Sequence, residues 1–280
     1  MVNLLVNENL FLIILALVWI IGAIVQDLRR REVDNIWNFS LIGFALAYRF
    51  AVFAFNGQIW FFINGLIGLL VFLFLGNLFY YSRLFAGGDA KLLIALGTIL
   101  PLSYDWIINF KIFGLFILLF LFGGSIYVFI WSLFLIVINW NKFSKEFVRQ
   151  FKIYRYIFLI SFVFVLLWMI MSYFIGSEFI LIGLIFLLFP VLLTFSKAVE
   201  ESCMIRMIGV KDLTEGDWLA EDIYVKGNKI KKSWDGVSGR ELELIRKKYH
   251  RKILVKYGVP FTPSFLIGFL GLLWLGKTFF

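Results

Sequence analysis

The fold is decided by residues 59–81, IWFFINGLIGLLVFLFLGNLFYY, which are followed at residues 86–91 by AGGDAK. The first stretch has no charged residue and is long enough to cross a bilayer, because a helix rises about 1.5 Å per residue and the hydrocarbon core is about 30 Å thick. Other apolar runs lie at about 4–25, 38–55, 112–140, 156–175, 179–195 and 261–276, with a shorter one at about 90–102. We therefore predict an all-α polytopic membrane protein with about eight transmembrane helices, one of them short.

Composition supports a membrane protein and limits its chemistry. Of the 280 residues, 62% are hydrophobic and only 16% are charged, whereas soluble domains are about half apolar and a quarter charged. Cys203 is the only cysteine and His250 the only histidine, which excludes an internal disulfide and a Cys- or His-based metal cluster. Phosphate-loop and dinucleotide motifs are also missing, so we expect no metal and no cofactor.

The distribution of basic residues predicts the topology. If the N-terminus is outside, the loops at 26–37, 82–89, 141–155 and 197–260 face the cytoplasm and contain nearly all of the Lys and Arg residues. This asymmetry is the one that the positive-inside rule requires. The net charge of +9 therefore indicates contact with membrane lipids and not with nucleic acid.

Polarity along the chain suggests three domains. They are a membrane helical domain at 1–196, a small cytoplasmic domain at 197–260 and a final transmembrane helix at 261–280. In the cytoplasmic domain, residues 223–225 and 229–231 flank Gly227-Asn228 and predict a β-hairpin. Ser238, with Glu241 three residues later, predicts a capping box that opens a helix. We expect a small α+β domain here.

Two aspartates stand out because acidic residues are scarce in the membrane segments. Asp27 ends the first apolar run and Asp89 begins the short one, so the predicted topology places both at the cytoplasmic boundary. An ionisable group at membrane depth is costly and marks a functional site by default. Gly87 and Gly88 remove two side chains beside Asp89 and would let another backbone approach.

Two adjacent carboxyl groups suit peptide hydrolysis, in which one takes a proton from water and the other protonates the scissile carbonyl. They do not ionise together cheaply, so they share a proton. The N-terminus of a helix and the nearby Lys91 should favour the charged form of Asp89, whereas the C-terminus of a helix should favour protonated Asp27. We therefore expect Asp89 to be the base, with Gly87, Gly88 and Lys91 shaping the site.

The residues around both aspartates resemble the archaeal type IV prepilin and preflagellin peptidases, membrane aspartyl proteases with a Gly-x-Gly-Asp signature. Residues 27–35, DLRRREVDN, look like the first motif of that family, and residues 88–92, GDAKL, look like the second. Residues 255–265, VKYGVPFTPSF, are similar to the start of the last helix in archaeal members. Ala86 departs from the signature by replacing its first glycine, and a positive φ would strain an alanine there.

The resemblance implies an aspartic endopeptidase that removes the N-terminal leader of prepilin-like or preflagellin-like proteins at the cytoplasmic face. It implies no methyltransferase activity, because the paired cysteines of the bacterial enzymes are missing. Glu32 and Asp34 would attract a basic leader.

Two alternatives use the same acidic residues. An intramembrane protease of the presenilin or signal-peptide-peptidase kind resembles this chain less well, since Gln26 precedes Asp27 here where a tyrosine is typical. A proton- or ion-coupled transporter would bind ions with Asp27, Asp89 and Lys91, but such proteins usually show repeat symmetry. No convincing repeat is visible in this sequence.

Overall fold

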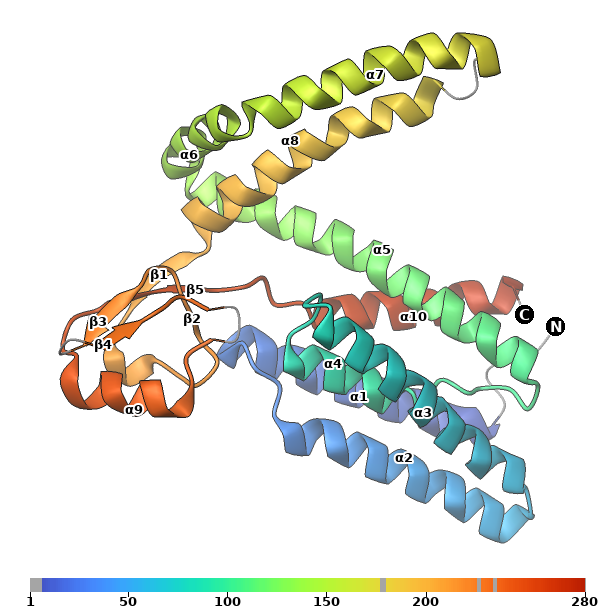
Figure 1. The fold of residues 1–280 in the computed structure, drawn as a ribbon. Coiled ribbons are helices and arrows are strands. Elements are labelled where there is room, and N and C mark those ends of the chain that lie inside the picture. Colours follow the sequence, from blue (N-terminus) through green and yellow to red (C-terminus); the bar gives the residue numbers. More distant parts are fainter. Residues whose placement is uncertain (1–6, 177–179, 226–227, 234–235, 280) are drawn as a thin grey trace. The chain divides into compact units, whose positions relative to one another are not determined.

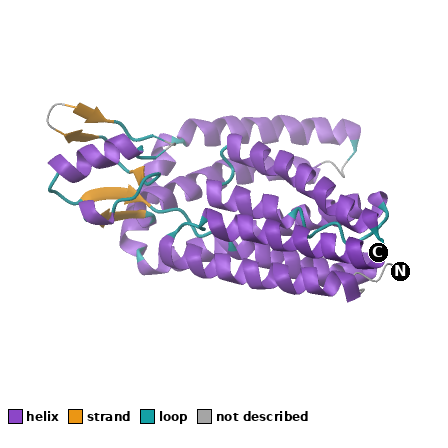
Figure 2. Ribbon diagram, turned by 90° about the horizontal axis from the view of Figure 1, so that it is seen from below, coloured by secondary structure: helices purple, strands orange, loops and turns teal. Residues whose placement is uncertain are grey.

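The computed structural model describes residues 7–176, 180–225, 228–233 and 236–279. The chain divides into two compact units, one of Met1–Ile130 with Val259–Phe280 and the other of Trp131–Gly258. The second unit is therefore inserted, in sequence, between the two parts of the first. Among the described residues, helices make up most of both units, and all of the strands belong to the second (Figures 1 and 2).

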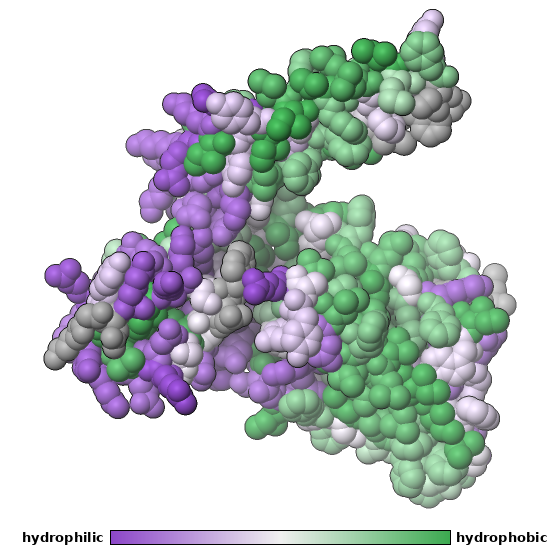
Figure 3. Space-filling model, viewed as in Figure 1, coloured by the Kyte–Doolittle hydropathy of each residue, from purple (hydrophilic) through white to green (hydrophobic). Residues whose placement is uncertain are grey.

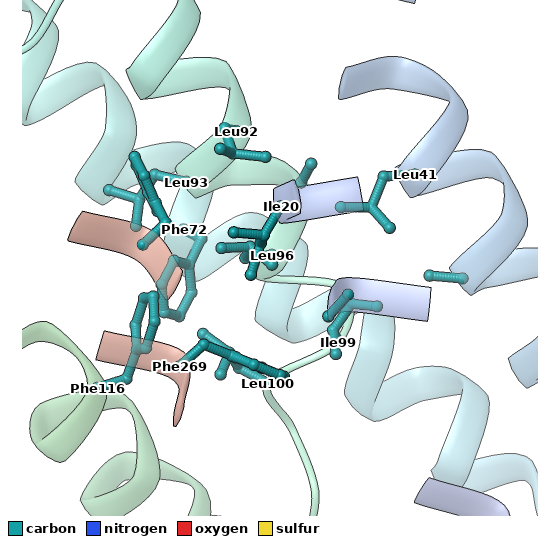
Figure 4. Packing of buried hydrophobic residues seen from close by; sticks show 14 of the residues in the cluster. Ile20, Leu41, Phe72, Leu92, Leu93, Leu96, Ile99, Leu100, Phe116 and Phe269 are labelled. Carbon is teal, nitrogen blue, oxygen red and sulfur yellow. The ribbon is translucent and has the colours of Figure 1, made fainter. Parts of the chain in front are cut away.

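The first unit is a helical bundle. Its helices are α1 (Asn7–Arg30), α2 (Asn35–Asn56), α3 (Ile59–Tyr81), α4 (Gly87–Leu96), the first part of α5 (Trp106–Ile138) and α10 (Pro263–Phe279). Apolar side chains from all of these helices form one core, in which Leu92, Leu93 and Leu96 of α4 are fully buried. Figure 4 shows Leu92, Leu93 and Leu96 among Ile20, Leu41, Phe72 and Phe269. The short helix is thus enclosed by the longer ones.

Two glycines of α3 bring its backbone close to α4. A Cβ added at Gly76 would lie 2.5 Å from Ile94 Cγ1 and 3.0 Å from the carbonyl oxygen of Ala90. A Cβ at Gly68 would lie 2.2 Å from the carbonyl oxygen of Gly97, just after α4. Small residues at these positions allow the close helix packing that is common in membrane proteins.

The C-terminal end of α4 is held by Arg49 of α2, which is fully buried. Its guanidinium group donates hydrogen bonds of 2.7–3.1 Å to the carbonyl oxygens of Phe61, Thr98, Ile99 and Pro101. Three of these acceptors, in Thr98, Ile99 and Pro101, belong to the segment that follows α4. Carbonyl groups at the C-terminal end of a helix need hydrogen-bond donors from outside the helix. A cation also suits the negative end of the helix dipole. Arg49 therefore fixes the end of α4 that is opposite Asp89.

The second unit begins with the last residues of α5 and continues through α6 (Trp140–Ile153), α7 (Arg155–Ile175) and α8 (Ile180–Cys203). Helix α6 packs on α8, where Phe143 joins Ala198, Val199 and Cys203 in a small apolar cluster. Figure 3 shows mainly hydrophobic side chains over α7, and α7 packs on α8.

A small α+β region follows α8. It contains β1 (Ile205–Ile208), the 3₁₀ turn η2 (Val210–Asp212), β2 (Trp218–Leu219), β3 (Ile223–Val225), β4 (Asn228–Ile230), α9 (Gly239–Lys248) and β5 (Ile253–Lys256). Strand β5 lies between β1 and β2 and is antiparallel to both, with Ile205 opposite Lys256 and Leu219 opposite Val255. Lys256 also contacts Glu200 at 3.0 Å and Glu201 at 2.6 Å, which ties this sheet to α8.

The predicted local features of this region are confirmed. Strands β3 and β4 pair antiparallel, with Val225 opposite Asn228, so the second arm begins one residue earlier than predicted. The residues at 226–227 lie outside the described part of the chain. Ser238 and Glu241 form the reciprocal capping box at the start of α9.

The predicted number of membrane helices is only partly supported. Among the described residues, five helices are long and apolar enough to cross a membrane: Glu8–Arg30, Asn35–Asn56, Ile59–Tyr81, Trp106–Ile138 and Arg155–Phe174. The apolar part of α10, Pro263–Gly276, is shorter, and α4 has only 10 residues. Eight spans are therefore not shown. Most of the predicted connecting loop at 141–155 forms helix α6, which is not among the candidate spans.

The two units differ from the predicted domains at 1–196, 197–260 and 261–280. The prediction separated membrane from cytoplasmic residues, whereas the units separate residues by their mutual contacts. These are different properties, so the predicted division stays a prediction.

Candidate active site

Asp27 lies in the last turn of α1 and is only 8% exposed. The helix ends because Arg31 adopts a left-handed conformation, with φ of 61°, and its N–H donates to the carbonyl oxygen of Asp27 at 2.9 Å. A residue in this conformation is a common way to end a helix. The sequence thus places a carboxyl group at the end of a candidate membrane span.

Thr262, just before α10, holds the Asp27 carboxylate. Its backbone N–H donates to Asp27 Oδ2 at 3.2 Å and its hydroxyl donates to the same oxygen at 2.9 Å. Thr262 is fully buried, so both bonds are shielded from water. Hydrogen bonds to a charged acceptor are stronger than those between neutral groups. The two bonds therefore offset the unfavourable position of a carboxylate at the C-terminus of α1.

Asp89 lies in the first turn of α4, outside the five candidate spans, and is partly buried. Burial of its carboxyl group raises the pKa of Asp89 to about 7, and the negative charge of Asp27 contributes to this rise. Asp27 and Asp89 are 62 positions apart in sequence, yet their charges interact. The two aspartates are therefore near enough for the charge of one to affect the other.

The direction of this pKa change is opposite to our expectation. We expected the helix N-terminus and Lys91 to favour ionised Asp89, but burial and the charge of Asp27 outweigh them. The Lys91 amino group is instead bonded to Asn35 Oδ1 at 2.6 Å. The raised pKa thus favours the protonated form of Asp89.

The backbone before Asp89 needs no glycine at position 86. Ala86 is the N-cap of α4 with φ of −68° and ψ of 160°, an extended conformation that alanine adopts without strain. A Cβ at Gly88 would meet Val33 at an ordinary distance of 3.5 Å or more, and one at Gly87 would lie 3.7 Å from Tyr80. The close approach that we predicted for these glycines is therefore not required; it occurs instead at Gly68 and Gly76.

Polar side chains from the start of α2 hold the start of α4. Asn38 Nδ2 donates to the carbonyl oxygen of Gly88 at 3.3 Å, and Lys91 donates to Asn35. Both contacts connect residues more than 45 positions apart. Lys91 therefore connects α4 to α2, and its predicted role in shaping the site stays a prediction.

Sequence reasoning missed Thr262, Asn38 and Arg49. Thr262 and Asn38 are ordinary polar residues whose importance depends on contacts between distant segments. Arg49 did carry a signal, because an arginine inside an apolar run is costly unless it is fully hydrogen-bonded. Its partners are backbone carbonyls, which a sequence does not distinguish.

Metal ligands are not gathered at this site. In the described ranges, no group of three or more His, Cys, Asp or Glu residues is placed to hold a metal ion. The expectation that no metal or cofactor is needed stays a prediction.

Several candidate membrane spans and two aspartates at helix ends are features expected of a membrane aspartic protease. Residues 13–140 match the model of the type IV leader peptidase family and include Asp27, Asp89 and Lys91. The chain thus carries a type IV leader peptidase domain, and it is an aspartic protease of the prepilin peptidase type. Searches of curated proteins and of solved structures found no significant match.

Proposed function

We propose that Asp27 and Asp89 are the catalytic pair of an endopeptidase that removes the N-terminal leader of prepilin-like or preflagellin-like proteins. The observation that supports this most directly is the raised pKa of Asp89, which comes first from burial of its carboxyl group and second from the charge of Asp27. Such coupling is typical of two aspartates that share one proton. The family domain contains both residues.

The proposed reaction uses the two carboxyl groups in different protonation states. The Asp27 carboxylate takes a proton from water, and the resulting hydroxide attacks the carbonyl carbon of the scissile peptide. Asp89 gives its proton to the carbonyl oxygen, which forms a neutral tetrahedral diol. The diol then collapses as its C–N bond breaks. The leaving nitrogen receives the proton that Asp27 had taken, and the Asp89 carboxylate takes back a proton from one hydroxyl group of the diol, so both aspartates return to their starting states. Both carboxyl groups act as acid and base, which is the usual division of work in such pairs.

The proposed site of cleavage is the cytoplasmic membrane boundary. Asp27 is at the end of span α1, and Asp89 follows the end of span α3. Because α1 and α3 are separated by one intervening span, α2, their C-terminal ends lie on the same side of a membrane. The basic loops support the cytoplasmic side. A prepilin leader precedes a hydrophobic stretch, so its cleavage point would lie at this depth.

The proposed substrate has a short basic leader. Glu32 and Asp34 are exposed on the turn that follows Asp27, where they would attract such a leader. Asp34 Oδ2 lies 3.8 Å from a guanidinium nitrogen of Arg30, and both side chains are exposed. Because such a surface ion pair is weak, the Asp34 carboxylate can still attract a basic leader. We expect no methyltransferase activity, and membrane lipids are the only other partner that we propose.

The test is cleavage of leader peptides fused to their hydrophobic segments by the detergent-solubilised protein. We expect a shortened product with the wild type, and a loss of about 10²- to 10⁴-fold in rate with Asp27→Asn or Asp89→Asn. Asp105→Asn is the matched control, because Asp105 only caps α5 through the N–H of Ile107 and asparagine caps equally well.

The alternative functions predict other outcomes. An intramembrane protease of the presenilin kind would cut inside the hydrophobic segment, which mass spectrometry of the products would show. A transporter would yield no shortened product while moving protons or ions across proteoliposome membranes. Substantial cleavage by either aspartate variant would contradict the proposed pair.

A further inference from the structure

We propose that Thr262 is a positioning residue, which holds the Asp27 carboxylate in the orientation that activates water. This inference rests on the proposed function. It starts from the two hydrogen bonds that Thr262 donates to one oxygen, Oδ2 of Asp27, at 3.2 and 2.9 Å. One donor would fix a distance; two donors from the same residue also fix the direction of the carboxylate.

The bonds also assign a role to each carboxylate oxygen. Because Oδ2 accepts from both the N–H and the hydroxyl of Thr262, it is an acceptor and does not carry the proton that the pair shares. The water is then activated by Oδ1, and the shared proton lies on Asp89. The raised pKa of Asp89 agrees with this division.

Thr262 is itself held rigidly. The N–H of Phe265 donates to its carbonyl oxygen at 3.0 Å, and Pro263 opens α10 directly after it. The ring of the preceding residue, Phe261, packs against Phe85 and Phe120 with centroid distances of 5.4 and 5.5 Å. Phe85 lies two residues before α4, which begins at Gly87. The turn at 261–262 therefore contacts both the Asp27 end of α1 and the approach to Asp89.

Thr262 is a positioning residue and not a catalytic one, because its partner is Asp27. Displacement of a reacting group by about 1 Å is enough to slow an enzyme by about 100-fold. Loss of the hydroxyl should therefore reduce kcat while the leader still binds, which leaves KM nearly unchanged.

The experiment compares Thr262→Val and Thr262→Ser with the wild type by measuring kcat and KM on a leader fusion peptide in detergent. Valine keeps the shape but removes the hydroxyl donor, whereas serine keeps it. We expect Val to lower kcat by about 10- to 100-fold with KM within about twofold, and Ser to recover most of the rate. Thr194→Val is the matched control, since Thr194 is also fully buried but belongs to α8 in the other unit.

Gel filtration and thermal unfolding show whether each variant is folded. If the Thr262→Val variant is not folded, the Thr262→Ala variant is measured in its place. Folded Val or Ala with the wild-type kcat would overturn the role of Thr262, and so would a Ser variant as slow as Val. Either result would leave the proposed catalytic role of the two aspartates standing, provided that the wild type cleaves the peptide and the Asp27→Asn variant does not. A wild type that makes no product would instead contradict the proposed function, and the role of Thr262 with it.

Discussion

At the scale of single residues, the site depends on an unequal pair of carboxyl groups. Two donors from Thr262 support the charge on Asp27, whereas burial and the nearby Asp27 charge raise the pKa of Asp89. Two aspartates with different surroundings can divide the roles of base and acid between them. This arrangement gives the pair a definite pH dependence.

The first prediction concerns this pH dependence. The mechanism requires protonated Asp89, whose pKa is raised to about 7, so kcat/KM should fall as pH increases through about 7. The measurement is a pH-rate profile on one leader peptide, from about pH 5 to about pH 9. A rate that rises steadily through neutral pH would contradict protonated Asp89.

The aspartates were predictable from sequence, and the residues that hold them were not. A carboxyl group at the end of an apolar run is conspicuous because burial of a charge is costly. Thr262 is common in type, and its bond to Asp27 joins residues 235 positions apart. The roles within the pair were expected in reverse, because helix dipoles are visible in a sequence whereas the burial of one side chain is not.

At the scale of elements, α4 is a short helix fixed at both ends. Asn38 and Lys91 hold its first turn, and Arg49 binds the carbonyl groups after its last turn. Its position between longer helices keeps Asp89 in place without a complete membrane crossing.

The second prediction tests this anchor. Arg49→Leu removes the donors to four carbonyl oxygens, and unpaired buried acceptors cost about 1–3 kcal/mol each before relaxation. We expect a lower unfolding temperature in detergent and reduced cleavage. Arg240→Leu is the control, because Arg240 lies on the exposed face of α9. An unchanged unfolding temperature in the Arg49 variant would contradict the anchoring role.

Helix and strand boundaries show what the sequence pattern could and could not reveal. The long apolar runs predicted α1, α2, α3, α5 and α7 because length and hydropathy suffice for them. The helix α6 was interpreted as a loop because its basic residues hid the apolar spacing of Phe143 and Phe147. The β1–β5 pairing was missed because it joins segments about 50 residues apart, and such register depends on tertiary packing.

At the scale of the whole molecule, topology is the prediction that most needs a measurement. In a Cys203→Ser background, Asn56→Cys at the last residue of α2 should react with a membrane-impermeant maleimide in intact cells. A cysteine at position 247 of α9 should react only after the membrane is permeabilised. Asn56 and Lys247 are both exposed, so accessibility in the protein does not limit either reaction. The reverse pattern would place the N-terminus inside.

The chain order of the site has a consequence for biosynthesis. Asp27 and Asp89 are translated early, but Thr262 follows only after the whole inserted unit. At about 5–20 residues per second, the ribosome needs roughly 10–50 s to travel from Asp27 to Thr262. Throughout this interval, the Asp27 carboxylate of the nascent chain lacks the two hydrogen bonds that Thr262 donates in the folded protein. The proposed contact between Thr262 and Asp27 therefore forms only after the second unit has been synthesised.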